Sequence, residues 1–172
     1  ADELRWYDGN GFADLNRLRG IGLCGTQSRR FAIDAFQQKM MGVQFRAGGT
    51  WPFFGSAAID FQDHHISLAD CWGDIRAHSL HMELIETPSV ARKFQIVFDA
   101  LVTHAARDFT HHPAVANALS RFHRAPLSTR VANAAADADI SQKKLIRLFS
   151  EQVGYTPKLY LRVLRFQRLL DK

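Results

Sequence analysis

The sequence is poor in cysteine and has no long apolar run. Its 172 residues include only two cysteines, Cys24 and Cys71, which is too few for the disulfide framework of a small secreted protein. No apolar stretch approaches the roughly 20 residues that a transmembrane helix needs. The N-terminus carries no Lys- or Arg-headed apolar segment of the signal-peptide type. These absences predict a cytoplasmic protein that does not enter a membrane.

Motifs of catalytic and metal sites are also missing. Neither HExxH, CxxC nor a Walker A loop occurs, and the eight histidines include adjacent pairs rather than a recognisable ligand set. Residues 20–25 (GIGLCG) fit the spacing GxGxxG, but no acidic residue follows at the distance expected in a dinucleotide-binding unit. A glycine-permitted turn between short strands is therefore favoured there. We expect no metal, no cofactor and no enzymatic activity.

Charge is distributed unevenly along the chain. The formal net charge is +5, yet residues 1–120 carry −2 and residues 121–172 carry +7. Such asymmetry is typical of a basic segment that binds nucleic acid or an anionic membrane, although a solvated basic helix face gives the same pattern. Because 47% of residues are hydrophobic and 23% charged, the composition is that of a globular protein. The length suits one domain or two small ones.

The N-terminal part mixes strand and helix signals. Alternating apolar residues predict strands at 31–36 and 41–45, whereas apolar residues at helical spacing predict helices at 68–86 and 89–109 and another from His112-Pro113 onward. We therefore expect an α+β fold: a small β-rich N-terminal part, then a mostly helical region. Four aromatic residues form either a core plug or the wall of a small-molecule pocket: Trp51, Phe53, Phe54 and Trp72.

A helix-turn-helix pattern follows the boundary at Ala125-Pro126. Ser128 or Thr129 can cap a first helix, Ser141 can cap a second, and Gly154 can end it in a left-handed conformation. One face of the second helix is apolar, with Leu145, Leu148, Phe149 and Val153. The other face carries Lys143, Ile146, Arg147 and Ser150, a composition that suits the edge of a DNA major groove as well as an ordinary solvated face.

This segment resembles the first helix-turn-helix of AraC/XylS-type transcription regulators. The resemblance rests on eight positions in order: Ser141, Leu145, Arg147, Phe149, Gly154, Pro157, Tyr160 and Arg165. Asp139 stands where the family usually has Gly, and Ala134 where it has a larger aliphatic residue. The resemblance implies base contacts by Lys143, Ile146 and Arg147. It implies phosphate contacts by Gln142 and Lys144, to which we add Lys158 and Arg162 of the following helix.

Upstream, residues 41–55, Asp63 and residues 68–73 are similar to the N-terminal domain of a subset of AraC-type regulators. We expect residues 1–125 to form an incomplete α+β domain of the sensory or dimerisation type. Residues 126–172 would hold one helix-turn-helix and the start of a linking helix. Family members carry a second helix-turn-helix after that helix, so the resemblance implies a fragment that is cut short at both ends.

Two functions remain open from the sequence. The first is a sequence-specific DNA-binding transcription regulator that is not an enzyme and has double-stranded DNA as its partner. A small-molecule effector and a second copy of the chain would be further partners of such a regulator. The alternative is a small-molecule-binding or protein-interaction module in which the basic helices are only scaffold.

Overall fold

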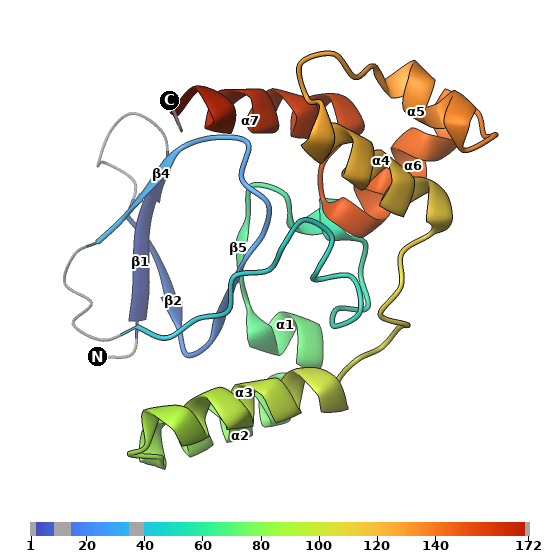
Figure 1. Cartoon of the computed structure of the whole chain (residues 1–172). Coiled ribbons are helices and arrows are strands. Elements are labelled where there is room, and N and C mark those ends of the chain that lie inside the picture. Colours follow the sequence, from blue (N-terminus) through green and yellow to red (C-terminus); the bar gives the residue numbers. More distant parts are fainter. Residues whose placement is uncertain (1–2, 9–14, 35–39, 171–172) are drawn as a thin grey trace.

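The computed structural model describes residues 3–8, 15–34 and 40–170 and shows an α+β chain (Figure 1). Small antiparallel sheets lie at its N-terminal end, and the rest is mostly helical. The strands are β1 (Glu3–Asp8), β2 (Leu15–Arg19), β3 (Gly22–Cys24), β4 (Phe31–Ile33) and β5 (His65–Ser67). A 3-10 turn, η1 (Ala58–Phe61), precedes the helices α1 (Leu68–Trp72), α2 (Asp74–Glu86), α3 (Val90–Thr103), α4 (Pro113–Arg124), α5 (Val131–Asp137), α6 (Gln142–Val153) and α7 (Pro157–Leu170). None of the helices in these described ranges is long and apolar enough to span a membrane.

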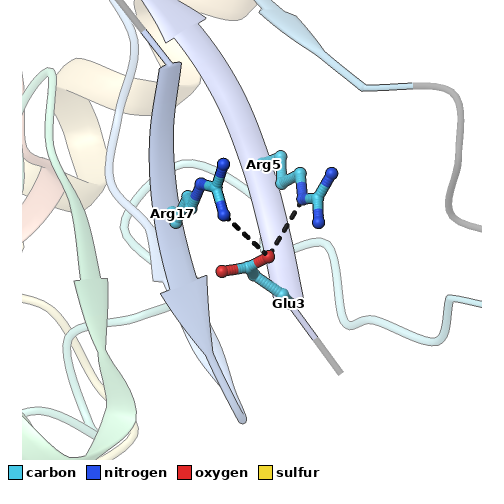
Figure 2. A network of polar contacts seen from close by, with 3 residues as sticks. All are labelled: Glu3, Arg5 and Arg17. Atoms are coloured by element: carbon cyan, nitrogen blue, oxygen red, sulfur yellow. Dashed lines mark hydrogen bonds and ion pairs between the residues drawn. The ribbon is translucent and has the colours of Figure 1, made fainter. Parts of the chain in front are cut away.

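The strands form two antiparallel sheets, with orders β2-β1-β4 and β3-β5. Arg5 of β1 pairs in register with Arg17 of β2, an arrangement that places two like charges opposite each other. Figure 2 shows how Glu3 compensates for this: its Oε2 lies 2.9 Å from the Arg5 Nε and 3.9 Å from the Arg17 Nη1. The carboxylate between the two guanidinium groups offsets their repulsion and supports the β1–β2 register.

The two strands predicted from alternating residues have different outcomes. Within 31–36, β4 covers Phe31–Ile33 and pairs with β1, while residues 35 and 36 lie outside the described part of the chain. The prediction of a strand at 41–45 is wrong, because that segment has no ladder partner among the described strands. The apolar residues of this segment do not share one environment: Phe45 contacts Phe53, with ring centroids 5.6 Å apart, whereas Val43 is exposed.

The helix predicted at 68–86 is divided in two at Gly73. Ser67 caps α1: its side chain accepts a hydrogen bond from the Ala69 N–H, and Asp70 completes a capping box. Gly73 then adopts φ 88° and ψ 152°, a conformation that L side chains rarely adopt. The chain turns there before α2 begins. Ile75, one of the apolar residues whose spacing predicts a single helix at 68–86, lies just after this turn and is 84% exposed.

The helix predicted at 89–109 is shorter, and its apolar face points elsewhere. Ser89 caps α3, which ends at Thr103, and Ile96 is its buried residue. Of the apolar residues whose spacing predicts this helix, Val97, Leu101 and Ala105 are half-buried, and four are exposed by 48–65% of their surface: Val90, Phe94, Phe98 and Val102. The spacing of four residues makes them one stripe on the helix. Helix α2 packs against α3 (Figure 1), yet these four side chains stay exposed.

A compact hydrophobic cluster holds the C-terminal helices together. Phe122 of α4 and Leu145 and Phe149 of α6 are fully buried in it. Helix α4 begins as predicted, with His112 as cap and Pro113 in its first turn. It contributes four buried residues to the cluster and forms an ion pair from Arg121 to Asp137 of α5. The cluster therefore extends across the boundary expected at Ala125-Pro126 and unites α4 with α5, α6 and α7.

Candidate nucleic-acid interface

Helices α5 and α6 form the predicted helix-turn-helix. The turn between them is closed by hydrogen bonds from the N–H groups of Asp139 and Ile140 to the carbonyls of Ala136 and Ala135. Asp139 takes a left-handed conformation, with φ 50°, which Asp tolerates better than most residues. Ala135, only 2% exposed, permits the close approach of the two helices. The predicted arrangement of two helices joined by a tight turn is thus confirmed.

The predicted caps of the two helices differ in outcome. Ser141 caps α6 by accepting a hydrogen bond from the Lys144 N–H at 3.2 Å. The expectation that Ser128 or Thr129 caps α5 is wrong: the cap position is Arg130, and it makes no side-chain hydrogen bond there. The buried Thr129 hydroxyl donates instead to the Ala125 carbonyl at 2.7 Å. It therefore stabilises the α4–α5 connection rather than the start of α5.

The residues predicted to contact bases share the outer side of α6. Lys143, Ile146 and Arg147 are exposed, while Leu145 and Phe149 on the other side are fully buried. Gln142 and Lys144, expected at phosphates, are exposed in the first turn of the helix. The free N–H groups of that turn favour an anion. The helix thus offers three cations, an apolar side chain and the positive end of its dipole to solvent.

Arg147 has only a weak partner. Its Nη1 lies 3.5 Å from the Glu151 Oε2, one turn along the same helix, and 68% of the Arg147 side chain is exposed. An exposed pair of this type is worth roughly 0.3–0.5 kcal/mol. A stronger acceptor, such as a guanine edge, could therefore replace Glu151 at little cost.

The cations of α7 divide into two groups. Lys158 and Arg162, expected at phosphates, are exposed, whereas Arg165 donates from Nε to the Pro126 carbonyl at 2.8 Å. Arg168 donates from Nη2 to the His123 carbonyl at 2.7 Å. The two groups that donate to carbonyls fasten the end of α4 and the loop after it to α7. These two hydrogen bonds therefore hold α7 against the segment that precedes the helix-turn-helix.

Tyr160 of α7 is buried in the hydrophobic cluster that α7 shares with α4, α5 and α6. Its ring packs against Phe122 and Phe149, with centroids 6.4 and 5.5 Å away, and its hydroxyl lies 2.7 Å from the His123 Nε2. Burial raises the pKa of Tyr160 to about 12, with a smaller contribution from Tyr155. The phenol is therefore neutral at physiological pH and can hydrogen-bond His123 without bringing a charge into the cluster.

The C-terminal end of α6 contacts the N-terminal part of the chain, which the sequence did not predict. Gly154 ends the helix with φ 82°, and a Cβ there would lie 2.9 Å from the Thr26 side chain. The Thr26 hydroxyl donates to the Gly154 carbonyl at 2.6 Å, and the Tyr155 hydroxyl donates to the Gln27 carbonyl at 2.7 Å. Since 128 residues separate the members of each pair, no local pattern could have revealed them.

The four aromatic residues predicted to line a pocket do not form one wall. Phe54 is buried and stacks on Trp72, with centroids 5.9 Å apart. Phe53 packs edge-on against Phe109 at 5.6 Å. Trp51 is covered by the Arg107 guanidinium, 3.8 Å above its ring.

Arg107 explains the shape of this aromatic segment. Its guanidinium donates to the carbonyls of Phe54, Gly55 and Ser56, so it holds the chain in a tight curve. An arginine can satisfy several carbonyls at once because it has five N–H donors in a planar fork. The segment is thus largely a core plug, and Arg107 is a residue that the sequence analysis missed.

A broad hollow of about 1500 Å³ lies between the N-terminal strands, α3 and α7. Phe54 and Trp72 contribute to its lining, but Trp51 and Phe53 do not. Its volume exceeds the roughly 300–1,000 Å³ that is usual for small-ligand pockets.

Among residues 3–8, 15–34 and 40–170, no group of three or more His, Cys, Asp or Glu residues converges as a metal site would require. No family model, curated protein or solved structure matches this chain.

Proposed function

We propose that this protein is a sequence-specific DNA-binding transcription regulator that inserts α6 into the major groove. The observation that carries the proposal is the helix-turn-helix itself: α6 projects Lys143, Ile146 and Arg147 from a rigid, buried support. In such a motif the second helix reads base edges with side chains near its N-terminal end. The AraC/XylS-like residue pattern supports the same assignment. The protein would act in the cytoplasm, without an enzymatic activity of its own.

Each outward residue of α6 has a distinct task in this proposal. Arg147 pairs bidentately with a guanine, Lys143 contacts an acceptor on a neighbouring base, and Ile146 contacts a thymine methyl group. Lys144, Lys158 and Arg162 contact phosphates, together with the neutral Gln142. The charge of +7 in residues 121–172 favours association with a polyanion in general. Phosphate contacts then fix the position of the helix, and base contacts select the sequence.

Binding to duplex DNA is expected to depend steeply on salt. Three neutralised phosphates correspond to a slope of about −3 in log K against log salt, or roughly 40-fold weaker binding between about 50 and 200 mM salt. Fluorescence anisotropy with a labelled duplex of random sequence measures the slope. Replacing Lys144, Lys158 and Arg162 together by Gln should bring the slope close to zero.

A matched control removes three cations elsewhere. Arg29, Arg46 and Arg76 are exposed and lie outside α5, α6 and α7. If their replacement by Gln flattens the salt slope as much as the triple change in α6 and α7 does, the positive charge acts without a defined interface. The DNA-binding assignment would then be wrong.

The exposed stripe on α3 supports self-association, and we propose a second copy of the chain as its occupant. Val90, Phe94, Phe98 and Val102 would meet their own equivalents across a two-fold axis, with the two α3 helices antiparallel. Arg92 and Asp99 project roughly 120–140° away from the centre of this stripe around the helix axis, so the proposed contact surface is apolar.

Replacing Phe94 by Ser is expected to raise the dimer dissociation constant at least about tenfold, because buried aromatic residues dominate the energetics of interfaces. Sedimentation equilibrium measures this constant. Leu127→Ser is the control, since Leu127 is also apolar and is 73% exposed but lies in the α4–α5 loop. A monomeric wild-type chain, or equal effects of the two substitutions, would rule out the α3 interface.

A further inference from the structure

Cys24 and His65 form a thiol–imidazole pair on the small β3–β5 sheet. The two residues are register partners in the antiparallel ladder, and the Cys24 Sγ lies 3.4 Å from the His65 Nε2. The imidazole is held in place by rings on both sides: Trp6 stacks on it at 4.5 Å, and Phe31 meets it edge-on at 4.7 Å. The ring therefore keeps one nitrogen directed at the sulfur.

The surroundings of the sulfur suit a nucleophile. The Gln27 side-chain amide donates to the Cys24 Sγ at 3.4 Å, a contact that stabilises negative charge on sulfur. Partial burial raises the pKa of the Cys24 thiol, against a lowering by the Gln27 hydrogen bond. The thiol therefore carries its proton at neutral pH and needs a base in order to react. In the tautomer whose Nε2 is unprotonated, His65 can accept that proton.

Cys71 provides a contrast within the same chain. It is half-buried, packs against the cluster around Phe54, and has the carboxylate of Asp70 nearby. Both burial and that carboxylate raise the pKa of the Cys71 thiol. Cys24 is instead exposed and lines the broad hollow described above, so a reagent can reach its sulfur and an adduct has room.

The strand end that carries Cys24 is connected directly to the proposed recognition helix. Two and three residues after Cys24, Thr26 and Gln27 make the hydrogen bonds to Gly154 and Tyr155 that secure the C-terminal end of α6. Gln27 also donates to the sulfur itself. A group attached to the Cys24 Sγ occupies space beside this amide and makes the sulfur a weaker acceptor, which would alter the segment that contacts the end of α6.

We propose that Cys24 is a modification site for soft electrophiles of the α,β-unsaturated carbonyl class, and that its adduct changes DNA binding through Gln27 and Tyr155. The second half of this inference rests on the proposed function. In the reaction the Cys24 Sγ forms a bond to the β-carbon, and the C=C π pair moves to the α-carbon. His65 takes the thiol proton as that bond forms and then returns it to the α-carbon, so the imidazole ends neutral. No other co-reactant is required.

The first experiment measures the chemistry without DNA. The full chain is treated with limiting N-ethylmaleimide at neutral pH, and mass spectrometry of peptides gives the labelling rates of Cys24 and Cys71. Cys24 is expected to react at least about tenfold faster, because a positioned general base typically contributes about 10²–10⁴-fold. His65→Phe keeps an aromatic ring beside Trp6 but removes the base, so it should slow Cys24 alone.

Two outcomes of this labelling would overturn the reactive pair. One is equal labelling of Cys24 and Cys71 in the wild-type chain. The other is an unchanged Cys24 rate in both His65→Phe and His65→Gln. Two different replacements of His65 are used because one of them could alter the fold. The Cys71 labelling rate in each variant reports whether the fold is intact.

The second experiment tests the connection to α6. A Cys71→Ser chain is labelled to completion at Cys24, and its affinity for a duplex selected by the unlabelled chain is measured before and after. We expect a change of at least about fivefold, which equals about 1 kcal/mol. An unchanged affinity overturns the connection but leaves the DNA-binding assignment intact. Failure of the unlabelled chain to select any duplex overturns the proposed function and the connection together, while the labelling rates still decide the chemistry.

Discussion

Replacing Arg147 by Ala is expected to weaken binding to a selected duplex by about 5- to 150-fold, the equivalent of roughly 1–3 kcal/mol for a bidentate pair with guanine. The duplex is one that the wild-type chain enriches from a randomised library. The substitution should also relax preference at one base position, because the remaining contacts on α6 do not distinguish that base. Anisotropy titrations against the selected duplex and single-base variants of it measure both effects.

Arg147 is a favourable residue for this test because little in the folded chain depends on it. Its side chain is largely exposed, and its 3.5 Å contact with Glu151 is an exposed pair within one helix. Ala also has the higher helix propensity. The substitution should therefore leave the free energy of unfolding within about 0.5 kcal/mol of wild type, so a loss of binding cannot be attributed to unfolding.

Two further substitutions separate base contacts from general charge. Lys158→Ala removes an exposed cation of α7 and should weaken all duplexes alike while making the salt slope less steep by about 1. Arg76→Ala removes an exposed cation of α2 and should change nothing. If Arg147→Ala resembles Lys158→Ala and shifts no base preference, α6 does not read sequence through Arg147.

The parts of the fold that the sequence predicts well are those determined within a few residues. Ser141, Asp139 and Gly154 each do what their side chain or backbone permits at a helix end or a tight turn. The apolar spacing of α6 also identifies its buried side, because Leu145 and Phe149 must lie together on any helix of this sequence. Local sterics and periodicity suffice at such positions.

The predictions from the sequence are wrong where an element also needs a partner that lies far away in the chain. Residues 41–45 alternate like a strand, but a strand also needs a neighbouring ladder, and the described chain provides none there. The apolar stripe of α3 is present, yet Phe94 and Phe98 are exposed although α2 packs against the same helix. Periodicity shows that a helix has an apolar side without identifying what covers that side.

The contacts at the far end of α6 illustrate the same limit at the candidate site. Thr26 and Gln27 belong to a short segment that carries no motif, and their partners Gly154 and Tyr155 are 128 residues further along. Arg107 likewise stands in no motif, yet it donates to the carbonyls of residues 54–56, about 50 residues earlier in the chain. Hydrogen bonds between distant segments leave no periodic trace, so only the three-dimensional arrangement reveals them.

Replacing Phe149 by Ala is expected to lower the free energy of unfolding by about 3–5 kcal/mol, the usual cost of removing a fully buried phenylalanine. Its ring contacts Phe122 and Tyr160, with centroids 5.6 and 5.5 Å away, and it has no exposed surface. Since α4, α6 and α7 all contribute to this cluster, the cavity loosens the whole support of the helix-turn-helix. Urea denaturation followed by circular dichroism measures the loss.

Ile146, three residues before Phe149 in α6, is expected to show the opposite balance between loss of stability and loss of DNA binding. It occupies the same helix but is 37% exposed, so Ile146→Ala should change the free energy of unfolding by less than about 1 kcal/mol. It should nevertheless weaken the selected duplex through the lost contact with a thymine methyl group. The two substitutions therefore separate the inner from the outer side of α6. If Phe149→Ala leaves the denaturation midpoint unchanged, or Ile146→Ala lowers it equally, the two sides of α6 have been assigned the wrong way round.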